Sequence, residues 1–268
     1  MTQRLGKRFL VAILTGGVFA GTGVATSSGA PAQFLNISTR GFVQTGDRVL
    51  IGGFIVSGSG SKRVLLRGIG PSLKEAGLAN VLTNPTLEVR DQNGSPVFTN
   101  DDWKDAQRAE IEATGLAPRD DREAAVVANQ LPSGSYTAIL RGAANGTGIG
   151  LIEVYDLSPT SGALLANISS RGFVDAGDRA MIGGFIVGGG SDPARILARG
   201  IGPSLAGAGI ADSLSDPRLE LRRSNGALVA ANDNWKETQQ LAIEQTGAAP
   251  PRILESAIVA DLSAGAFA

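Results

Sequence analysis

The feature that most constrains this chain is a domain-sized internal repeat. Residues 34–56 read FLNISTRGFVQTGDRVLIGGFIV and residues 165–187 read LANISSRGFVDAGDRAMIGGFIV, so 16 of 23 positions are identical at an offset of 131. Three further motifs recur in the same order: RGIGPSL, LEVRDQNG (LELRRSNG in the second copy) and NDDWKDAQ (NDNWKETQ). This period is far longer than the roughly 20–50 residues of solenoid repeats. We therefore expect each copy to form a domain with its own core.

Short β-strand signals separated by glycine-rich turns fill each copy. In the first copy, apolar and β-branched runs predict strands at residues 48–56, 62–69, 87–90, 96–100, 135–141 and 149–156. Asn93-Gly94 predicts a hairpin turn because both residues tolerate positive φ. Helical patterns are confined to residues 71–77 and 104–114. We expect an all-β fold of two tandem β-sandwich or jelly-roll-like domains, each with one or two short helices.

The first 32 residues are typical of a secretory signal peptide. Arg4, Lys7 and Arg8 precede an apolar run, and Ala30-Pro31-Ala32 has the pattern of a cleavage site. A membrane anchor is the alternative, but the run is glycine-rich and shorter than the roughly 20 apolar residues of a span. We expect a bacterial protein that is secreted, on the cell surface or in the periplasm, with no stable membrane insertion after cleavage. The predicted units are the signal peptide (1–32), the first repeat (33–160) and the second repeat (161–268).

Two absences in the composition exclude several function classes. The chain has no cysteine, so an exported protein of this sequence has no disulfides and must rest on a hydrophobic core. It has no histidine, which removes Ser-His-Asp and Cys-His catalysis and imidazole-based zinc sites. Without the three N-terminal cations, 21 of the 24 basic residues remain against 25 acidic ones. That balance argues against nucleic acid as a partner, which requires a basic face.

Several motifs together resemble a known repeat. The segments LxNISTRGFV, GDRxLIGGFIV, RGIGPSL, NDDW and GTGIGLIEVYDL resemble a repeat found singly or in tandem in large exported proteins of environmental Gram-negative bacteria. The resemblance covers nearly all of residues 34–268. That family has no assigned catalytic activity, so the resemblance implies export and modularity. More loosely, LEVRDQNGSPVFTNDDW followed by LPSGSYTAILRG is similar to bacterial pre-peptidase C-terminal domains, which are secreted jelly-roll accessories of enzymes.

Clustered side-chain oxygens predict a candidate calcium site in each copy, because calcium takes six to eight oxygen ligands. The candidates are Asn100, Asp101, Asp102, Asp120, Asp121 and Glu123 in the first copy, and Asn232, Asp233, Asn234 and Glu255 in the second. The alternative, which we favour, is that Asp101 or Asp102 caps a helix that begins near Lys104. No cofactor is therefore required, and structural Ca²⁺ is the one candidate.

Trp103 and Trp235 are the only tryptophans, one in each copy. An exposed indole could stack on a sugar ring, but a single tryptophan beside a helix start more often packs in a core. The segment from Arg67 to Ser72, RGIGPS, resembles an anion cradle that leads into a helix. A tight glycine turn is the simpler interpretation, since no βαβ pattern surrounds it.

Four carboxylates of the first copy are candidates for catalysis: Asp120, Asp121, Glu123 and Glu153. A glycosidase needs two opposed carboxyls, but Asp120 and Asp121 have no acidic counterparts in the second copy. We therefore expect no enzyme. The sequence favours a non-catalytic secreted or cell-surface structural or interaction module, for example in adhesion. The alternative is a carbohydrate-binding accessory of a larger exported protein, with calcium as its candidate ion. The expected partners are other extracellular protein modules or surface glycans.

The second copy stops before the repeat is complete. Residues 256–268 align with 124–137, but the first copy continues through residues 138–157, AILRGAANGTGIGLIEVYDL. A missing hairpin has two explanations. Either the sequence is a fragment of a longer protein, or a strand from another chain fills the gap and causes self-assembly, as in donor-strand complementation. For the second case, residues 33–43 are the expected donor.

Overall fold

The computed structural model describes residues 7–15 and 32–268, and strands dominate it, which confirms the all-β class. Of the predicted signal peptide, residues 7–15 form a strand. Arg4 and the cleavage-site residues Ala30 and Pro31 lie outside the described residues. Among the described residues, no helix is long and apolar enough to cross a membrane.

The strands of the N-terminal half are β1 (Lys7–Thr15), β2 (Gln33–Val43), β3 (Leu50–Ile69), β4 (Pro85–Arg90), β5 (Pro96–Asn100), β6 (Ala124–Gly142) and β7 (Gly148–Asp156). Those of the C-terminal half are β8 (Ala163–Val174), β9 (Ile182–Gly188), β10 (Ala194–Ile201), β11 (Leu219–Arg222), β12 (Leu228–Asn232), β13 (Ser256–Leu262) and β14 (Gly265–Phe267). The helical turns are η1 (Gly46–Arg48), η2 (Pro71–Ala76), α1 (Arg108–Ala113), η3 (Ala143–Asn145), η4 (Gly177–Arg179), η5 (Pro203–Ala208) and α2 (Gln240–Gln245).

Turn residues and apolar runs in the sequence predicted the positions of several of these elements correctly. The predicted hairpin is formed by β4 and β5, and Gly94 of its turn has φ 79°, a value that suits glycine. Two predicted strands, 48–56 and 62–69, are joined in the single long strand β3. Its pairing with β6 shifts register between Val56 and Ser61, where the glycine-rich stretch lies. The second repeat has separate strands β9 and β10 at the corresponding positions.

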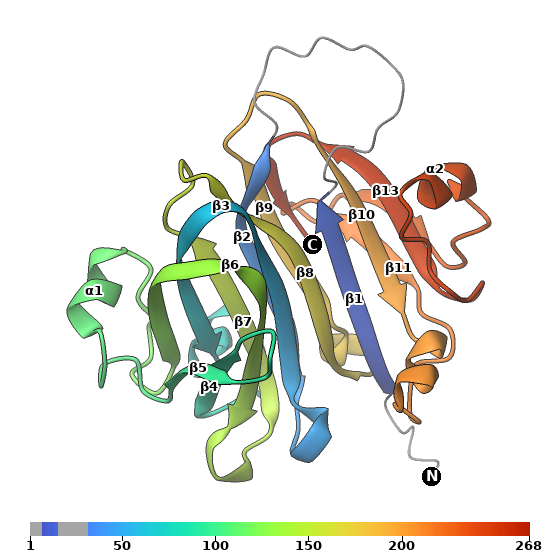
Figure 1. The fold of residues 1–268 in the computed structure, drawn as a ribbon. Coiled ribbons are helices and arrows are strands. Elements are labelled where there is room, and N and C mark those ends of the chain that lie inside the picture. Colours follow the sequence, from blue (N-terminus) through green and yellow to red (C-terminus); the bar gives the residue numbers. More distant parts are fainter. Residues whose placement is uncertain (1–6, 16–31) are drawn as a thin grey trace, which may run out of the picture.

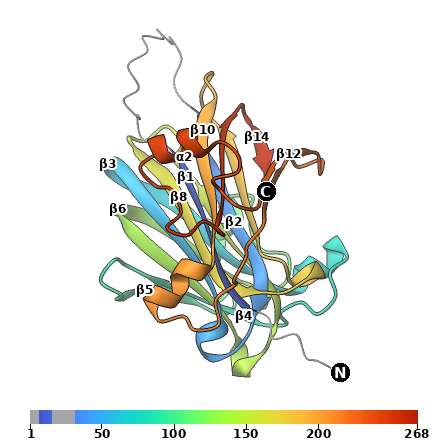
Figure 2. The ribbon, with the colours of Figure 1, turned by 90° about the vertical axis from the view of Figure 1, so that its right-hand side faces the viewer.

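The two repeats share one sheet. A 12-stranded sheet contains strands of both, and only β11 and β12 form a separate pair (Figures 1 and 2). Within it, β2 of the first repeat pairs with β9 of the second, and β8 of the second pairs with β3 of the first. The predicted boundary at residue 160 falls in the loop between β7 and β8. Strand pairing nevertheless crosses between the repeats, so they are not two separate tandem sandwiches.

The exchange between the repeats is reciprocal. Ile37 is opposite Phe185 in the β2–β9 pair, and Phe54 is opposite Ile168 in the β3–β8 pair. These two pairs correspond to each other at the repeat offset of 131. The repeats are thus related as the two subunits of a symmetric dimer would be.

Equivalent side chains meet where the two repeats cross. The buried hydroxyls of Thr39 and Ser170, which are equivalent residues, are hydrogen-bonded to each other. Nearby, the rings of Phe42 and Phe173 have centroids 6.2 Å apart. The guanidinium groups complete the reciprocity by stacking across the interface: Arg48 lies over Phe173, and Arg179 lies over Phe42.

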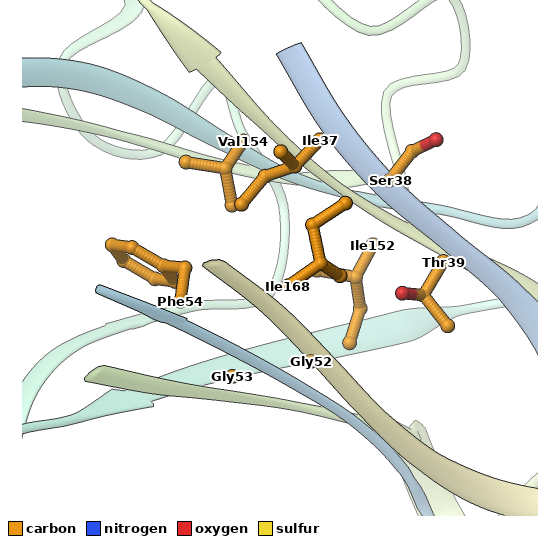
Figure 3. A pocket seen from close by; sticks show the side chains of 9 residues that line it. All are labelled: Ile37, Ser38, Thr39, Gly52, Gly53, Phe54, Ile152, Val154 and Ile168. Carbon is orange, nitrogen blue, oxygen red and sulfur yellow. The ribbon is translucent and has the colours of Figure 1, made fainter. Parts of the chain in front are cut away.

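The main core is shared as well. Its buried cluster includes Phe34, Phe54 and Leu140 of the first repeat with Ile168 and Phe185 of the second. Figure 3 shows apolar side chains of β2, β3, β7 and β8 around a cavity of about 10 Å³, which is the size of one water molecule at most. The expectation that each copy has its own core is therefore wrong, because the first strands of each copy pack and pair with the other.

Candidate functional site

The repeated Asn-Asp-Asp/Asn-Trp motifs fasten a loop to the edge of a strand. Asn100 Oδ1 accepts a hydrogen bond of 2.8 Å from the Ala125 amide at the start of β6. In the second repeat, Asn232 Oδ1 accepts one of the same length from the Ala257 amide of β13. Each asparagine also donates through Nδ2 to the main-chain oxygen two residues later. These amide groups are therefore used within the fold.

A pair of glutamines, which sequence reasoning missed, forms further hydrogen bonds between the same loops and the strands β6 and β13. Gln107 donates to the carbonyl oxygen of Val127 and accepts from its amide, at 2.8 and 3.0 Å. Gln239 does the same to Val259, at 2.9 and 3.0 Å. Each side-chain amide acts like one residue of a neighbouring strand, so the edges of β6 and β13 are partly covered. The repetition of glutamine in NDDWKDAQ and NDNWKETQ was the available signal.

The helix-capping interpretation of the aspartates is wrong. Helix α1 begins at Arg108, and its N-cap residue is Gln107 with φ 56°, not Asp101 or Asp102. The helix therefore begins four residues after the predicted Lys104. The four intervening residues form a turn and bends instead.

The glutamates of the predicted calcium sites bind a loop of the protein itself. The carboxylate oxygen Oε1 of Glu123 accepts hydrogen bonds from the amides of Gly70 and Ser72, at 3.0 and 2.9 Å, and from the Ser72 hydroxyl at 2.6 Å. Glu255 makes the same three contacts in the second repeat. Gly70 is required there because a Cβ would lie 2.3 Å from the carbonyl oxygen of Leu82. The RGIGPS loop is thus an anion cradle, and its anion is an internal glutamate.

Two of the other acidic candidates form ion pairs, whereas Asp102 Oδ1 is buried without a hydrogen-bond partner among the described groups. Asp120 is paired with Arg122 at 2.9 Å, and this guanidinium lowers the pKa of Asp120. Asp121 is paired with Lys104 at 2.5 Å. Burial raises the pKa of Asp101, and the charges of its neighbouring aspartates add to the effect.

In the second repeat, Asp233 is exposed, and Asn234 donates to Glu237. The described part of the chain has no group of three acidic side chains arranged for a metal ion. Calcium binding by these clusters therefore stays a prediction without geometric support.

Both tryptophans are buried, with 4% of Trp103 and 5% of Trp235 exposed. Each is at the centre of a small apolar cluster beneath α1 or α2, which is separate from the shared core. The indole Nε1 groups donate to the carbonyl oxygens of Asp120 and Arg252. Because the ring faces are covered, neither tryptophan presents a stacking platform for a sugar.

The two repeats also differ in the strand that lies between β2 and β3 in the first and between β8 and β10 in the second. In the first repeat, β7 pairs with β2 on one side and with the second half of β3 on the other. In the second repeat, the corresponding neighbours are β8 and β10, and the strand between them is β1, from the N-terminus (Figure 1). The predicted donor, residues 33–43, is instead β2, which pairs with β7 and β9. That prediction is wrong.

Strand β1 pairs with β8 and β10 in the same register in which β7 pairs with β2 and β3. Val43 is opposite Gly148 in the first repeat, and its equivalent Val174 is opposite Lys7. On the other side, Arg67 is opposite Glu153, and its equivalent Arg199 is opposite Ala12. Both neighbours therefore place residues 7–15 at the positions of residues 148–156.

In the first repeat, this strand supplies a carboxylate to a half-buried arginine. Arg67 donates from Nε and Nη2 to Glu153 Oε2, at 2.9 and 2.5 Å, and from Nη1 to the Leu116 carbonyl at 2.6 Å. Tyr155 donates to the other oxygen of Glu153 at 2.8 Å, and its ring lies under the Arg67 guanidinium. Burial, together with the charge of Glu153, raises the pKa of Tyr155 to about 12.

In the second repeat, the matching arginine lacks this carboxylate. Arg199 donates from Nη1 to the carbonyl oxygen of Ala248 at 3.0 Å, as Arg67 does to Leu116. Its Nε is buried and has no hydrogen-bond partner among the groups that the structure describes. Burial lowers the pKa of Arg199, an effect that the charge of Glu255 partly offsets.

A cavity of about 300 Å³ marks the other difference at this end of the second repeat. Its apolar lining residues include Met181, Ile182 of β9, Leu219 and Leu221 of β11, and Ala268, and charged side chains such as Arg218 and Glu220 also line it. In the first repeat, Leu140 of β6 occupies the corresponding space, opposite Leu50 of β3 and Leu87 of β4. The position of β1 and this cavity together correspond to the β6–β7 hairpin.

No known family model, curated protein or solved structure matches the chain. The resemblance to repeats of exported proteins therefore stays a prediction.

Proposed function

We propose that this chain is a non-catalytic structural and interaction module of an exported protein, and that its second repeat accepts a β-strand. The observation that carries the proposal is the position of β1, which pairs between β8 and β10 in the register of β7. Main-chain hydrogen bonds on both sides of an inserted strand provide affinity, as in other forms of strand addition. The partners are then other extracellular protein modules.

The predicted signal peptide explains why the position between β8 and β10 would accept a strand from elsewhere. Residues 7–15 lie within the segment that export would remove, so an exported chain would need another strand between β8 and β10. Without one, two rows of main-chain donors and acceptors would be unpaired, and such edges bind strands of other chains. The carbohydrate-binding alternative depended on exposed tryptophans, and both are buried.

The proposal is tested by strand exchange in the folded full chain. A protease site inserted between residues 20 and 21 allows the segment that carries β1 to be separated from the body after folding. A fluorescent peptide with the sequence of residues 148–156, GIGLIEVYD, is then added. We expect one peptide to bind per cleaved chain with release of the N-terminal fragment, measured by fluorescence anisotropy and mass spectrometry. The uncleaved chain is the control and should bind much less.

The opposite result is also clear. If the cleaved body remains folded by circular dichroism, loses its N-terminal fragment and binds no peptide, the strand-accepting function is wrong. If two peptides bind per chain, the strand β7 of the first repeat is also replaceable, and the position between β8 and β10 is not specific.

A further inference from the structure

We infer that the position between β8 and β10 selects a strand that carries a glutamate opposite Arg199, within a hairpin of the β6–β7 type. This inference rests on the proposed strand-accepting function and specifies the chemistry of the partner. The partner is recognised by three properties: an extended apolar strand, one carboxylate at a defined register position, and a preceding strand with a large apolar side chain.

The glutamate requirement follows from the comparison of two equivalent arginines. Both Arg67 and Arg199 donate from Nη1 to a main-chain oxygen of the loop after α1 or α2, so both guanidinium groups are held in the same way. Only Arg67 also has a carboxylate, from Glu153 of the inserted strand. The residue of β1 at this register position is Ala12, which has no polar side-chain group.

In the described part of the chain, the carboxylate whose charge acts on Arg199 is that of Glu255, and it has other partners. Glu255 is close enough to affect it electrostatically, but Glu255 accepts hydrogen bonds from the amides of Gly202, Ser204 and Arg252. A buried donor without a partner costs free energy, and a charged hydrogen bond is stronger than a neutral one. A strand with glutamate opposite Arg199 therefore gains an interaction that residues 7–15 cannot provide.

The requirement for a preceding strand follows from the cavity. Its lining residues Met181 and Leu219 are equivalent to Leu50 and Leu87, which are the residues opposite Leu140 in the first repeat. A partner that brings a leucine to this place would bury apolar surface on both sides. In the first repeat, the segment equivalent to the inserted strand is residues 148–156, and the segment equivalent to the cavity is residues 137–142. These two segments form consecutive strands of one hairpin, so one hairpin can fill both places in the second repeat.

The experiment uses the cleaved full chain and three synthetic peptides. The first has the sequence of residues 138–157, AILRGAANGTGIGLIEVYDL. In the second, the residue corresponding to Glu153 is changed to glutamine, which keeps size and hydrogen-bonding capacity but removes the charge. In the third, the residue corresponding to Leu140 is changed to alanine. Dissociation constants are measured by competition against the fluorescent nonapeptide.

We expect the glutamate hairpin to bind about tenfold or more tightly than the glutamine peptide, since charged hydrogen bonds contribute more than neutral ones and 1.4 kcal/mol corresponds to a factor of ten. In the variant Arg199→Met, this preference should vanish. The alanine peptide should also bind about tenfold or more weakly than the glutamate hairpin, because removal of a buried leucine side chain is costly.

Three results would overturn the inference, and they differ from a failure of the proposed function. Equal affinity for the glutamate and glutamine peptides would leave strand acceptance intact and remove the selectivity. A preference that persists in Arg199→Met would assign it to another group. Self-association of the cleaved chain that excess hairpin does not reverse would show that the occupant is a second copy of this chain. Absence of binding by any peptide would instead reject strand acceptance itself.

Discussion

Lys62 and Asp156 form an ion pair inside the first repeat, and replacing Asp156 by asparagine tests how far this pair secures β7. The ammonium nitrogen lies 2.6 Å from a carboxylate oxygen, and the two side chains are 0% and 1% exposed. Lys62 also donates to the carbonyl oxygens of Ser158 and Ala163 and to the Ser161 hydroxyl. At the corresponding positions the second repeat has Ala194 and, in β1, Thr15, so this pair is not repeated.

Asp156→Asn removes the charge and leaves the lysine buried without its counterion. Breaking a buried pair in this way costs about 3–5 kcal/mol. Because three oxygens still accept from the ammonium group, we expect the lower end of that range, about 3 kcal/mol. For a chain of this size, that loss corresponds to a decrease in Tm of roughly 6–12 °C.

The assay is urea unfolding followed by circular dichroism, applied to Asp156→Asn, Lys62→Met and the double variant. The double variant should lose less stability than the sum of the single variants, by about 2 kcal/mol or more, because the two groups interact directly. Asp261→Asn is the control, since the Arg195–Asp261 pair is exposed and should contribute under about 1 kcal/mol. Additive losses, or a loss no larger than that of the control, would refute the reasoning.

Three other predictions follow from contacts of Glu123 and Tyr155 and from the strand pairing between the repeats. Glu123→Ala should lower stability by about 2–6 kcal/mol, because one buried and one half-buried amide lose their acceptor. EDTA should leave the melting temperature of the parent chain unchanged; stabilisation by millimolar calcium would contradict the internal role of Glu123. Tyr155 keeps its proton to a pKa of about 12, above its ordinary value of 10, so its contribution to stability is complete below pH 10 and is lost as the pH rises through 12. Tyr155→Phe should therefore flatten the decline of stability in that window, as followed by urea unfolding; an unchanged decline would show that other groups cause it. Residues 33–160 alone should form a two-fold dimer in sedimentation experiments, because β2 and the first half of β3 pair with their equivalents; a folded monomer would contradict this.

Local structure was predictable because its signals are local. The β4–β5 hairpin and the strand β7 lie within two residues of their predicted bounds, since turn chemistry and apolar runs define them directly. The partner of each strand was not predictable in this way. Residues 34–56 and 165–187 are so similar that pairing within a repeat and pairing between repeats satisfy the same local pattern. Only the packed structure distinguishes the two arrangements.

The candidate site shows a related limit. The sequence contains an amide-rich loop, from Gly70 to Ser72, and an acidic cluster that includes Glu123, and each was interpreted as a site for an external ligand. In the fold they are each other's partners. The available signal was selective repetition, because Glu123 has a counterpart in Glu255 whereas Asp120 and Asp121 have none.

The N-terminal strand was missed for a different reason. The apolar run that includes residues 7–15 has the features of an export signal, and those features do not exclude a strand. Its place depends on pairing with β8 and β10, which are distant in sequence. Neither the apolar run nor the strands β8 and β10 alone identify this pairing.

The contact between Thr39 and Ser170 has a consequence for any protein that is assembled from this repeat. Two copies meet there through the same surface, so every substitution at such a position faces its own counterpart and must be compatible with it. The surface at which one copy crosses another is therefore buried only when two copies are paired. A chain with an even number can close all of its crossings internally, whereas an odd copy has to find its counterpart in a separate molecule. Parity of copy number would then decide whether such a protein is self-contained or joins others.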